Sequence, residues 1–252
     1  MDDKLLRDNV ERDLVKTLRD ERDLADIAAT LGEISIDNLL DDGLAKNIPI
    51  IKTARSALKA YASYRDYLLI KKLLTFLVSL ESVPHAQRVS QVDQLACDEK
   101  ERRRLGENLL LLLDRLDDIT KPEMLANAWS AYLQQRINRD QLLDLHHAID
   151  RVRMPDLPVL VDTYLGRTSE SGLQYFPPWK ETSKSQTIAP PYGESSDEDR
   201  VTGAAWSRLT QLSTCGLFDS IHGRGGGIGG RAGGLRRNEL GQLFVDFVLR
   251  AS

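Results

Sequence analysis

The chain has few aromatic residues, only two cysteines and no long apolar run. Aromatics make up 6% of its 252 residues whereas leucine is common, which favours helices packed through aliphatic side chains over a β-sandwich. No stretch reaches the roughly 18 apolar residues of a transmembrane helix, and the charged start, MDDKLLRDNVERD, is not a signal peptide. These absences predict a cytoplasmic protein that meets the inner membrane only peripherally, if it meets it at all.

Neither metal nor disulfide chemistry is indicated by the cysteines. Cys97 and Cys215 lie far apart in the sequence and lack the paired spacing of a zinc site or a disulfide framework. We expect two free, buried thiols, because unpaired cysteine is usually buried. No cofactor is expected either.

Residues 1–166 carry the periodicity of a helical bundle. Apolar residues at i+4 spacing predict a first helix over 2–31, and 50–80 contains no glycine or proline, which predicts one long helix or two. Capping patterns begin at Asp98, Thr120 and Asn138. Further helices are expected over 86–96, 99–118, 120–135, 138–153 and up to Gly166.

The leucine run at 109–113 is apolar on every side of a helix, which is typical of a buried helix. We therefore expect this helix to be the centre of the core. Its largely buried residues should be Leu109, Leu112, Leu113 and Leu116.

Composition changes after residue 166. Residues 167–200 are rich in proline, serine and threonine and are predicted to be a linker or extended loop. The last segment, 201–252, then reads as helix, strand, glycine-rich turn, strand and helix. The predicted fold is therefore mainly α: a helical bundle (1–166), a linker (167–200) and a small winged-helix-like α+β unit (201–252).

Basic residues are concentrated in 48–80, which has six of them against one acid in a chain of net charge −4. Three share one face of a helix beside an apolar face, a pattern typical of helices that lie on anionic membranes. The alternative is a core helix with a solvated basic face. The candidate membrane or partner surface consists of Lys52, Arg55, Lys59, Lys71 and Lys72.

A second basic group surrounds the glycine-rich turn at 223–234. It consists of Arg224, Arg231, Arg236 and Arg237. A basic hairpin tip can lie along a phosphate backbone, so these arginines are candidate nucleic-acid contacts; the alternative is a solvated loop. The turn contains a Gly-x-Gly-x-x-Gly spacing, but no helix pattern follows it, which argues against a dinucleotide site.

No catalytic constellation stands out. His146 and Asp150 are four residues apart on a predicted helix beside His147, and we interpret them as a structural contact because no second ligand pair accompanies them. The acids around the leucine run alternate with Arg102, Arg103, Arg104 and Arg115, which offers ordinary ion pairs. No nucleophile motif is present.

Several short motifs resemble a broad group of bacterial helical proteins. They are Asp41-Asp42-Gly43-Leu44, Ile48 to Ile51, Lys71 to Leu77, Gly106 to Asp118, Lys121-Pro122-Glu123 and the tail Asn238-Glu239-Leu240-Gly241-Gln242-Leu243-Phe244. The resemblance implies a helical body followed by a winged-helix-like tail. Such proteins are met among bacterial phage-defence genes. No activity is established for the group, so no site residue carries over.

These patterns together favour a non-enzymatic binding protein, an antiphage-defence component that engages a membrane surface, a lipid or a partner protein. One alternative is a DNA-binding transcriptional regulator that uses the arginine-rich wing. Another is an enzyme whose site lacks a recognisable motif.

Overall fold

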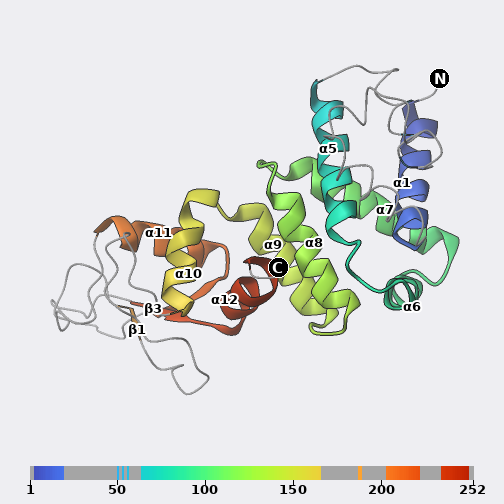
Figure 1. Cartoon of the computed structure of the whole chain (residues 1–252). Coiled ribbons are helices and arrows are strands. Elements are labelled where there is room, and N and C mark those ends of the chain that lie inside the picture. Colours follow the sequence, from blue (N-terminus) through green and yellow to red (C-terminus); the bar gives the residue numbers. More distant parts are fainter. Residues whose placement is uncertain are drawn as a thin grey trace. The chain divides into compact units, whose positions relative to one another are not determined.

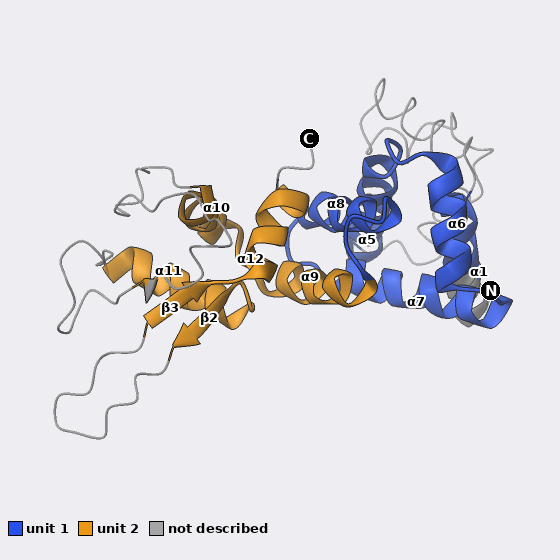
Figure 2. Ribbon diagram, turned by 90° about the horizontal axis from the view of Figure 1, so that it is seen from below, with its two compact units in different colours: residues 1–138 blue, residues 139–252 orange. Residues whose placement is uncertain are grey.

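The computed structural model in Figure 1 describes residues 3–19, 50, 53, 56, 64–165, 187–188, 203–221 and 234–249. Within them the chain is mainly helical, as predicted. It divides into two compact units, residues 1–138 and 139–252, which Figure 2 colours separately. None of the described helices has the length and apolar content to cross a bilayer.

The N-terminal unit contains five described helices. They are α1 (Asp3–Arg19), α5 (Tyr64–Ser79), α6 (His85–Leu95), α7 (Glu99–Arg115) and α8 (Lys121–Leu133). Helix α1 packs on α6 and α7, while α5 packs on α7 and α8. The helices predicted after residue 84 are confirmed within a few residues. The first helix is described only to Arg19, and most of 50–63 lies outside the described residues.

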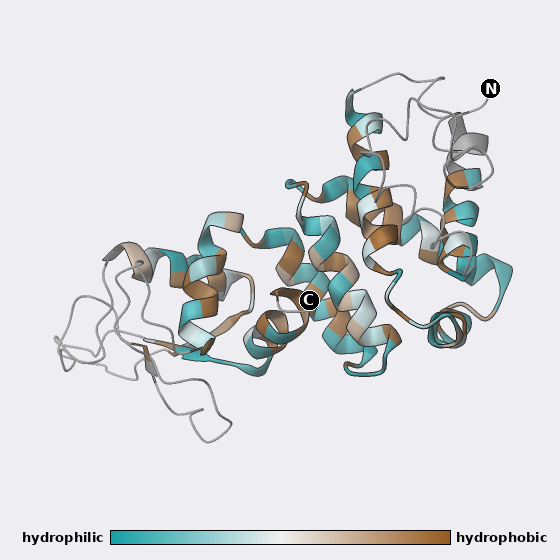
Figure 3. Ribbon diagram, in the orientation of Figure 1, coloured by the Kyte–Doolittle hydropathy of each residue, from teal (hydrophilic) through white to brown (hydrophobic). Residues whose placement is uncertain are grey.

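Helix α8 forms the core of this unit, so the prediction that the leucine run of α7 does so is wrong. Eleven of the thirteen residues of α8 are buried. Alanines bring neighbouring helices close, and the Trp129 ring meets Phe76 edge-on, with centroids 6.4 Å apart. Most of the other helices have both hydrophobic and hydrophilic residues around their circumference, as Figure 3 shows.

Helix α7 is two-sided rather than buried all round. Leu109, Leu113 and Leu116 are buried as predicted, but Leu112 is half-buried and Leu111 is 50% exposed. Successive residues of a helix are turned by about 100°, so five consecutive leucines cannot all face the body of the unit.

Gly106 explains how closely α7 approaches α1. A Cβ atom at this position would collide with the backbone carbonyl of Glu11 in α1. Glycine costs about 1 kcal/mol relative to alanine within a helix. This position tolerates that cost because only glycine lets the two backbones come this close.

The caps of α7 and α8 differ from one another. Asp98 caps α7 as predicted, since its carboxylate accepts the Glu101 N–H at 2.8 Å. Thr120 does not cap α8: its own backbone is helical, and its N–H and hydroxyl donate to Asp118 at 2.8 and 2.7 Å. The Thr120 hydroxyl is the main reason that the pKa of Asp118 lies below its ordinary value.

The C-terminal unit combines helices with a small antiparallel sheet. Its elements are α9 (Arg139–Arg151), the 3-10 turn η2 (Met154–Asp156), α10 (Leu157–Leu165), β1 (Thr187–Ile188), α11 (Gly203–Thr214), β2 (Phe218–Ile221), β3 (Gly234–Arg237), α12 (Glu239–Leu243) and the π-helical turn η5 (Phe244–Leu249). The sheet order is β1-β3-β2, with Thr187 and Asp219 both opposite Arg236. The predicted order of helix, strand, strand and helix is confirmed, and β1 is a strand within the predicted linker.

The boundary between the units falls before α9, whereas the sequence placed it at residue 166. Tyr164, at the end of α10, is 1% exposed, and its hydroxyl lies 2.7 Å from the Leu217 carbonyl oxygen and accepts the Asn238 N–H at 2.9 Å. Burial raises the pKa of this hydroxyl above its ordinary value. The side chain of Arg237 also donates to the Thr163 carbonyl at 3.0 Å. These bonds join α10 to the strands and helices that follow it.

Candidate functional site

One of the five residues of the predicted basic surface, Lys72, is buried in the interior. Lys72 is 9% exposed, and its Nζ donates to the carbonyls of Leu116, at 2.5 Å, and Asp114, at 3.3 Å. These carbonyls end α7, where unpaired acceptors and the helix dipole favour a cation. Desolvation lowers the pKa of Lys72 below its ordinary value. Lys72 therefore caps a helix, which corrects its assignment to a membrane or partner surface.

Of the other four residues of that surface, the structure describes only Lys71. Lys71 is half-buried on α5. Lys52, Arg55 and Lys59 lie outside the described residues, so their part in a binding surface stays a prediction.

The four tail arginines have different environments. Arg237 is 2% exposed and bonded to α10, and burial lowers its pKa, so its guanidinium supports the fold and is not available to a phosphate. Arg236 is 44% exposed and lies 3.6 Å from Asp219 on the neighbouring strand. Arg224 and Arg231 lie outside the described residues.

Two of the acids beside the leucine run form ion pairs with residues outside α7. Asp114 pairs with Arg65 of α5, and Asp117 pairs with the buried Lys121 at 2.6 Å. Arg102 of α7 instead lies 3.6 Å from Asp93 of α6. Sequence spacing offers the i,i+4 pair of Asp117 and Lys121, whereas the packing of α5 on α7 brings Arg65 to Asp114.

The structure offers no metal site in its described part, where no three histidine, cysteine, aspartate or glutamate residues come together. The two cysteines are not both buried, contrary to prediction: Cys97 is exposed and Cys215 half-buried. The Cys97 thiol donates to Glu101 at 2.8 Å, and this hydrogen bond raises the pKa of the thiol.

His146 is half-buried on α9. Burial, reinforced by the charge of His147, lowers the pKa of His146 to about 4. A buried neutral imidazole resists protonation in the folded state but gains a proton at about pH 6.5 in the unfolded chain.

Acidification should therefore destabilise the protein through His146. The free energy of unfolding should fall between about pH 6.5 and pH 4, with up to about 3 kcal/mol due to this residue, because only the unfolded state binds the proton there. Urea unfolding at pH 7 and pH 4.5 measures the loss. His146→Gln should reduce it, whereas the exposed control His147→Gln should retain most of it; equal losses in both variants would contradict the assignment.

Helix α11 presents a polar outer face. Its exposed residues Ser207, Thr210, Gln211 and Thr214 follow helical spacing, while Leu209 and its apolar neighbours on the opposite face are buried. No acid occurs anywhere from Gly203 to Thr214. Gly216, with φ +82°, then turns the chain into β2. The result is a polar helix face beside strands β2 and β3, on which the hydroxyls of Thr210 and Thr214 donate to the carbonyls of Trp206 and Gln211 in their own helix.

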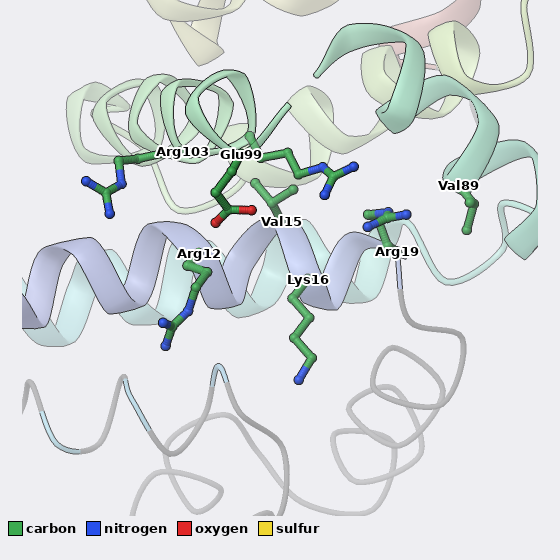
Figure 4. A pocket seen from close by; sticks show the side chains of 8 residues that line it. Arg12, Val15, Lys16, Arg19, Val89, Glu99 and Arg103 are labelled. Atoms are coloured by element: carbon green, nitrogen blue, oxygen red, sulfur yellow. The ribbon is translucent and has the colours of Figure 1, made fainter. Parts of the chain in front are cut away.

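A cationic pocket of about 380 Å³ lies in the N-terminal unit between α1, α6 and α7 (Figure 4). Its charged lining consists of Arg12, Lys16, Arg19, Glu99, Arg102 and Arg103, and Val15 and Val89 add apolar surface. Sequence reasoning missed it because the two contributing groups are some eighty residues apart. The signal was present as basic residues at i, i+4 and i+7 in α1, a spacing that puts three cations on one helix face.

Comparison with known proteins adds no assignment: no family model, curated protein or solved structure matches this chain.

Proposed function

We propose that this chain is a non-enzymatic binding protein whose C-terminal unit is a winged-helix module that contacts duplex DNA. The observation that carries the proposal is the strand order β1-β3-β2. In winged-helix domains a strand that precedes the reading helix pairs with the last strand of the wing, and here β1 precedes α11 and pairs with β3. Sequence patterns alone made DNA binding the alternative, and the strand order favours it.

The surface chemistry of α11 supports a reading role. The second helix of such motifs enters the major groove, where glutamine, serine and threonine side chains can bond base edges. Thr210 and Gln211 lie at the centre of the exposed face, and no carboxylate on this helix would repel phosphates. Arg208 on α11 and Arg236 on β3 supply nearby positive charge. Arg224 and Arg231, which lie outside the described residues, are predicted from the sequence to add to it.

The affinity for duplex DNA should be low and should fall steeply as the salt concentration rises. With about three phosphate contacts, affinity for a random-sequence duplex should fall roughly 40-fold between 50 and 200 mM salt. Combining Thr210→Glu with Gln211→Glu should weaken binding by about tenfold or more, because two carboxylates would face the DNA. Fluorescence anisotropy at low salt measures both effects.

The matched control combines Gln87→Glu with Gln94→Glu, which adds the same two negative charges at exposed positions of α6. It should leave affinity within about twofold of wild type. A second variant replaces Arg224, Arg231 and Arg236 by alanine and spares the structural Arg237; it should bring binding to the detection limit. Equal affinities of the wild type and the α11 variant for duplex DNA would contradict the proposal.

A partner protein is the second candidate, favoured by apolar residues exposed on the N-terminal unit. Tyr64 is 76% and Leu111 50% exposed. The membrane alternative rests on Lys52, Arg55 and Lys59. It stays a prediction, as does a role in phage defence.

A further inference from the structure

We propose that the cationic pocket between α1, α6 and α7 binds a compact polyanion carrying several phosphate groups. This site lies in the N-terminal unit, so it is independent of the DNA contact proposed for the C-terminal unit. The ligand is either a free phosphorylated small molecule or the phosphorylated headgroup of a lipid, which share this chemistry.

The first support is the distribution of charge. Helix α1 contributes Arg12, Lys16 and Arg19, and α7 contributes Arg102 and Arg103; Glu99 is the one acid in the lining. Figure 4 shows Glu99 extending from α7 toward α1. Asp13 lies 3.7 Å from Arg12 and Asp93 pairs with Arg19, yet the five lining cations outnumber these acids and Glu99. A bound anion would offset the remaining positive charge.

The second support is that Asp93 fixes the positions of two of the lining cations. Asp93 of α6 lies 3.1 Å from Arg19 and 3.6 Å from Arg102, so it holds a guanidinium from each helix. The guanidinium groups of these two arginines are therefore positioned before a ligand arrives, which lowers the entropic cost of binding it. Arg19 and Arg102 keep 34% and 31% of their side-chain surface exposed, so an anion in the pocket can still reach them.

The third support is the match between the pocket and phosphate chemistry. A volume of about 380 Å³ suits a small molecule. Guanidinium forks bind phosphate oxygens in pairs. A chain of tetrahedral phosphates directs oxygens toward donors on both α1 and α7, whereas a single planar carboxylate presents only two oxygens. A polyphosphate therefore fits this lining better than a carboxylate.

The test uses inorganic tripolyphosphate and the full chain, with calorimetry at 50 mM salt. We expect one molecule to bind per chain. Lys16→Gln combined with Arg103→Gln removes two lining cations but leaves Arg19, Arg102 and Asp93 in place. Affinity should fall about a hundredfold, since each lost charge-assisted contact is worth roughly tenfold.

The control combines Lys100→Gln with Arg104→Gln. It makes the same change of charge on exposed positions of α7 outside the lining. Its affinity should stay within a few-fold of wild type, and circular dichroism should show equal helix content in all three proteins. Absence of tripolyphosphate binding together with absence of vesicle binding, or equal weakening in both double variants, would overturn the proposal.

A second arm identifies the source of the phosphate. Wild type is mixed with phosphatidylcholine vesicles that contain phosphatidylglycerol or a phosphorylated inositol lipid. Flotation that tripolyphosphate abolishes, and that the Lys16/Arg103 variant lacks, assigns a lipid headgroup. Tripolyphosphate binding without flotation assigns a free ligand. Flotation that neither tripolyphosphate nor the variant changes would contradict a lipid ligand at this pocket.

Discussion

Leu113→Ala should lower the free energy of unfolding by about 2–5 kcal/mol, the usual range for removing a buried leucine. Leu113 is fully buried where α7 meets its neighbours. The loss combines transfer of the removed carbons to water with the cavity that they leave. Urea denaturation followed by circular dichroism measures the change.

Leu111→Ala is the matched control for this substitution. The residue type, the helix and the chemical change are the same, but Leu111 is 50% exposed. Its effect should stay below about 1 kcal/mol, because exposed positions contribute little packing. Similar losses at both positions would show that α7 is buried all round, as the leucine run alone predicted.

Gly241→Ala should destabilise the C-terminal unit by about 3 kcal/mol. A Cβ atom there would collide with the Tyr164 hydroxyl and the Leu217 carbonyl oxygen. Overpacking costs about 1–3 kcal/mol, and displacing Tyr164 from its buried partners adds to it. The opposing gain in helix propensity is only about 1 kcal/mol. Thermal unfolding of the variant measures the net loss.

Gly203→Ala provides the control within the same unit. Nothing lies within 4 Å of a Cβ atom at this position, the first residue of α11. The substitution should be neutral or stabilise by up to about 1 kcal/mol, since alanine restricts the unfolded chain. If both alanines were tolerated equally, the close contact between Tyr164 and Gly241 would be refuted.

Local sequence patterns predicted where the helices lie, but not which helix is the most buried. Asp98 caps α7 because its side chain bonds an amide three residues away, which depends only on nearby sequence. The central position of α8 could not be predicted in the same way. Its alanines and Trp129 stabilise the core by packing against neighbouring helices, which the sequence of α8 does not reveal. The leucine run of α7 is more hydrophobic and therefore predicted the wrong central helix.

The candidate sites depended still more on tertiary structure. Sequence patterning grouped Arg236 with Arg237, yet one is exposed and the other is buried against α10. Adjacent residues of a strand point to opposite faces of a sheet, which separates them. The strand β1 was missed because two residues carry no periodicity, and the pocket was missed because α1 and α7 are distant in sequence.

The most direct test of the proposed function is to map where duplex DNA contacts the chain. Backbone amide NMR shifts of the full protein would be followed as a short random-sequence duplex is added at low salt. We expect shifts to concentrate at Ser207, Thr210, Gln211 and Thr214 on α11 and at Arg236 on β3, with Arg237 changing little. Shifts confined to residues 1–138, or no shifts at all, would contradict a DNA-reading role for the C-terminal unit.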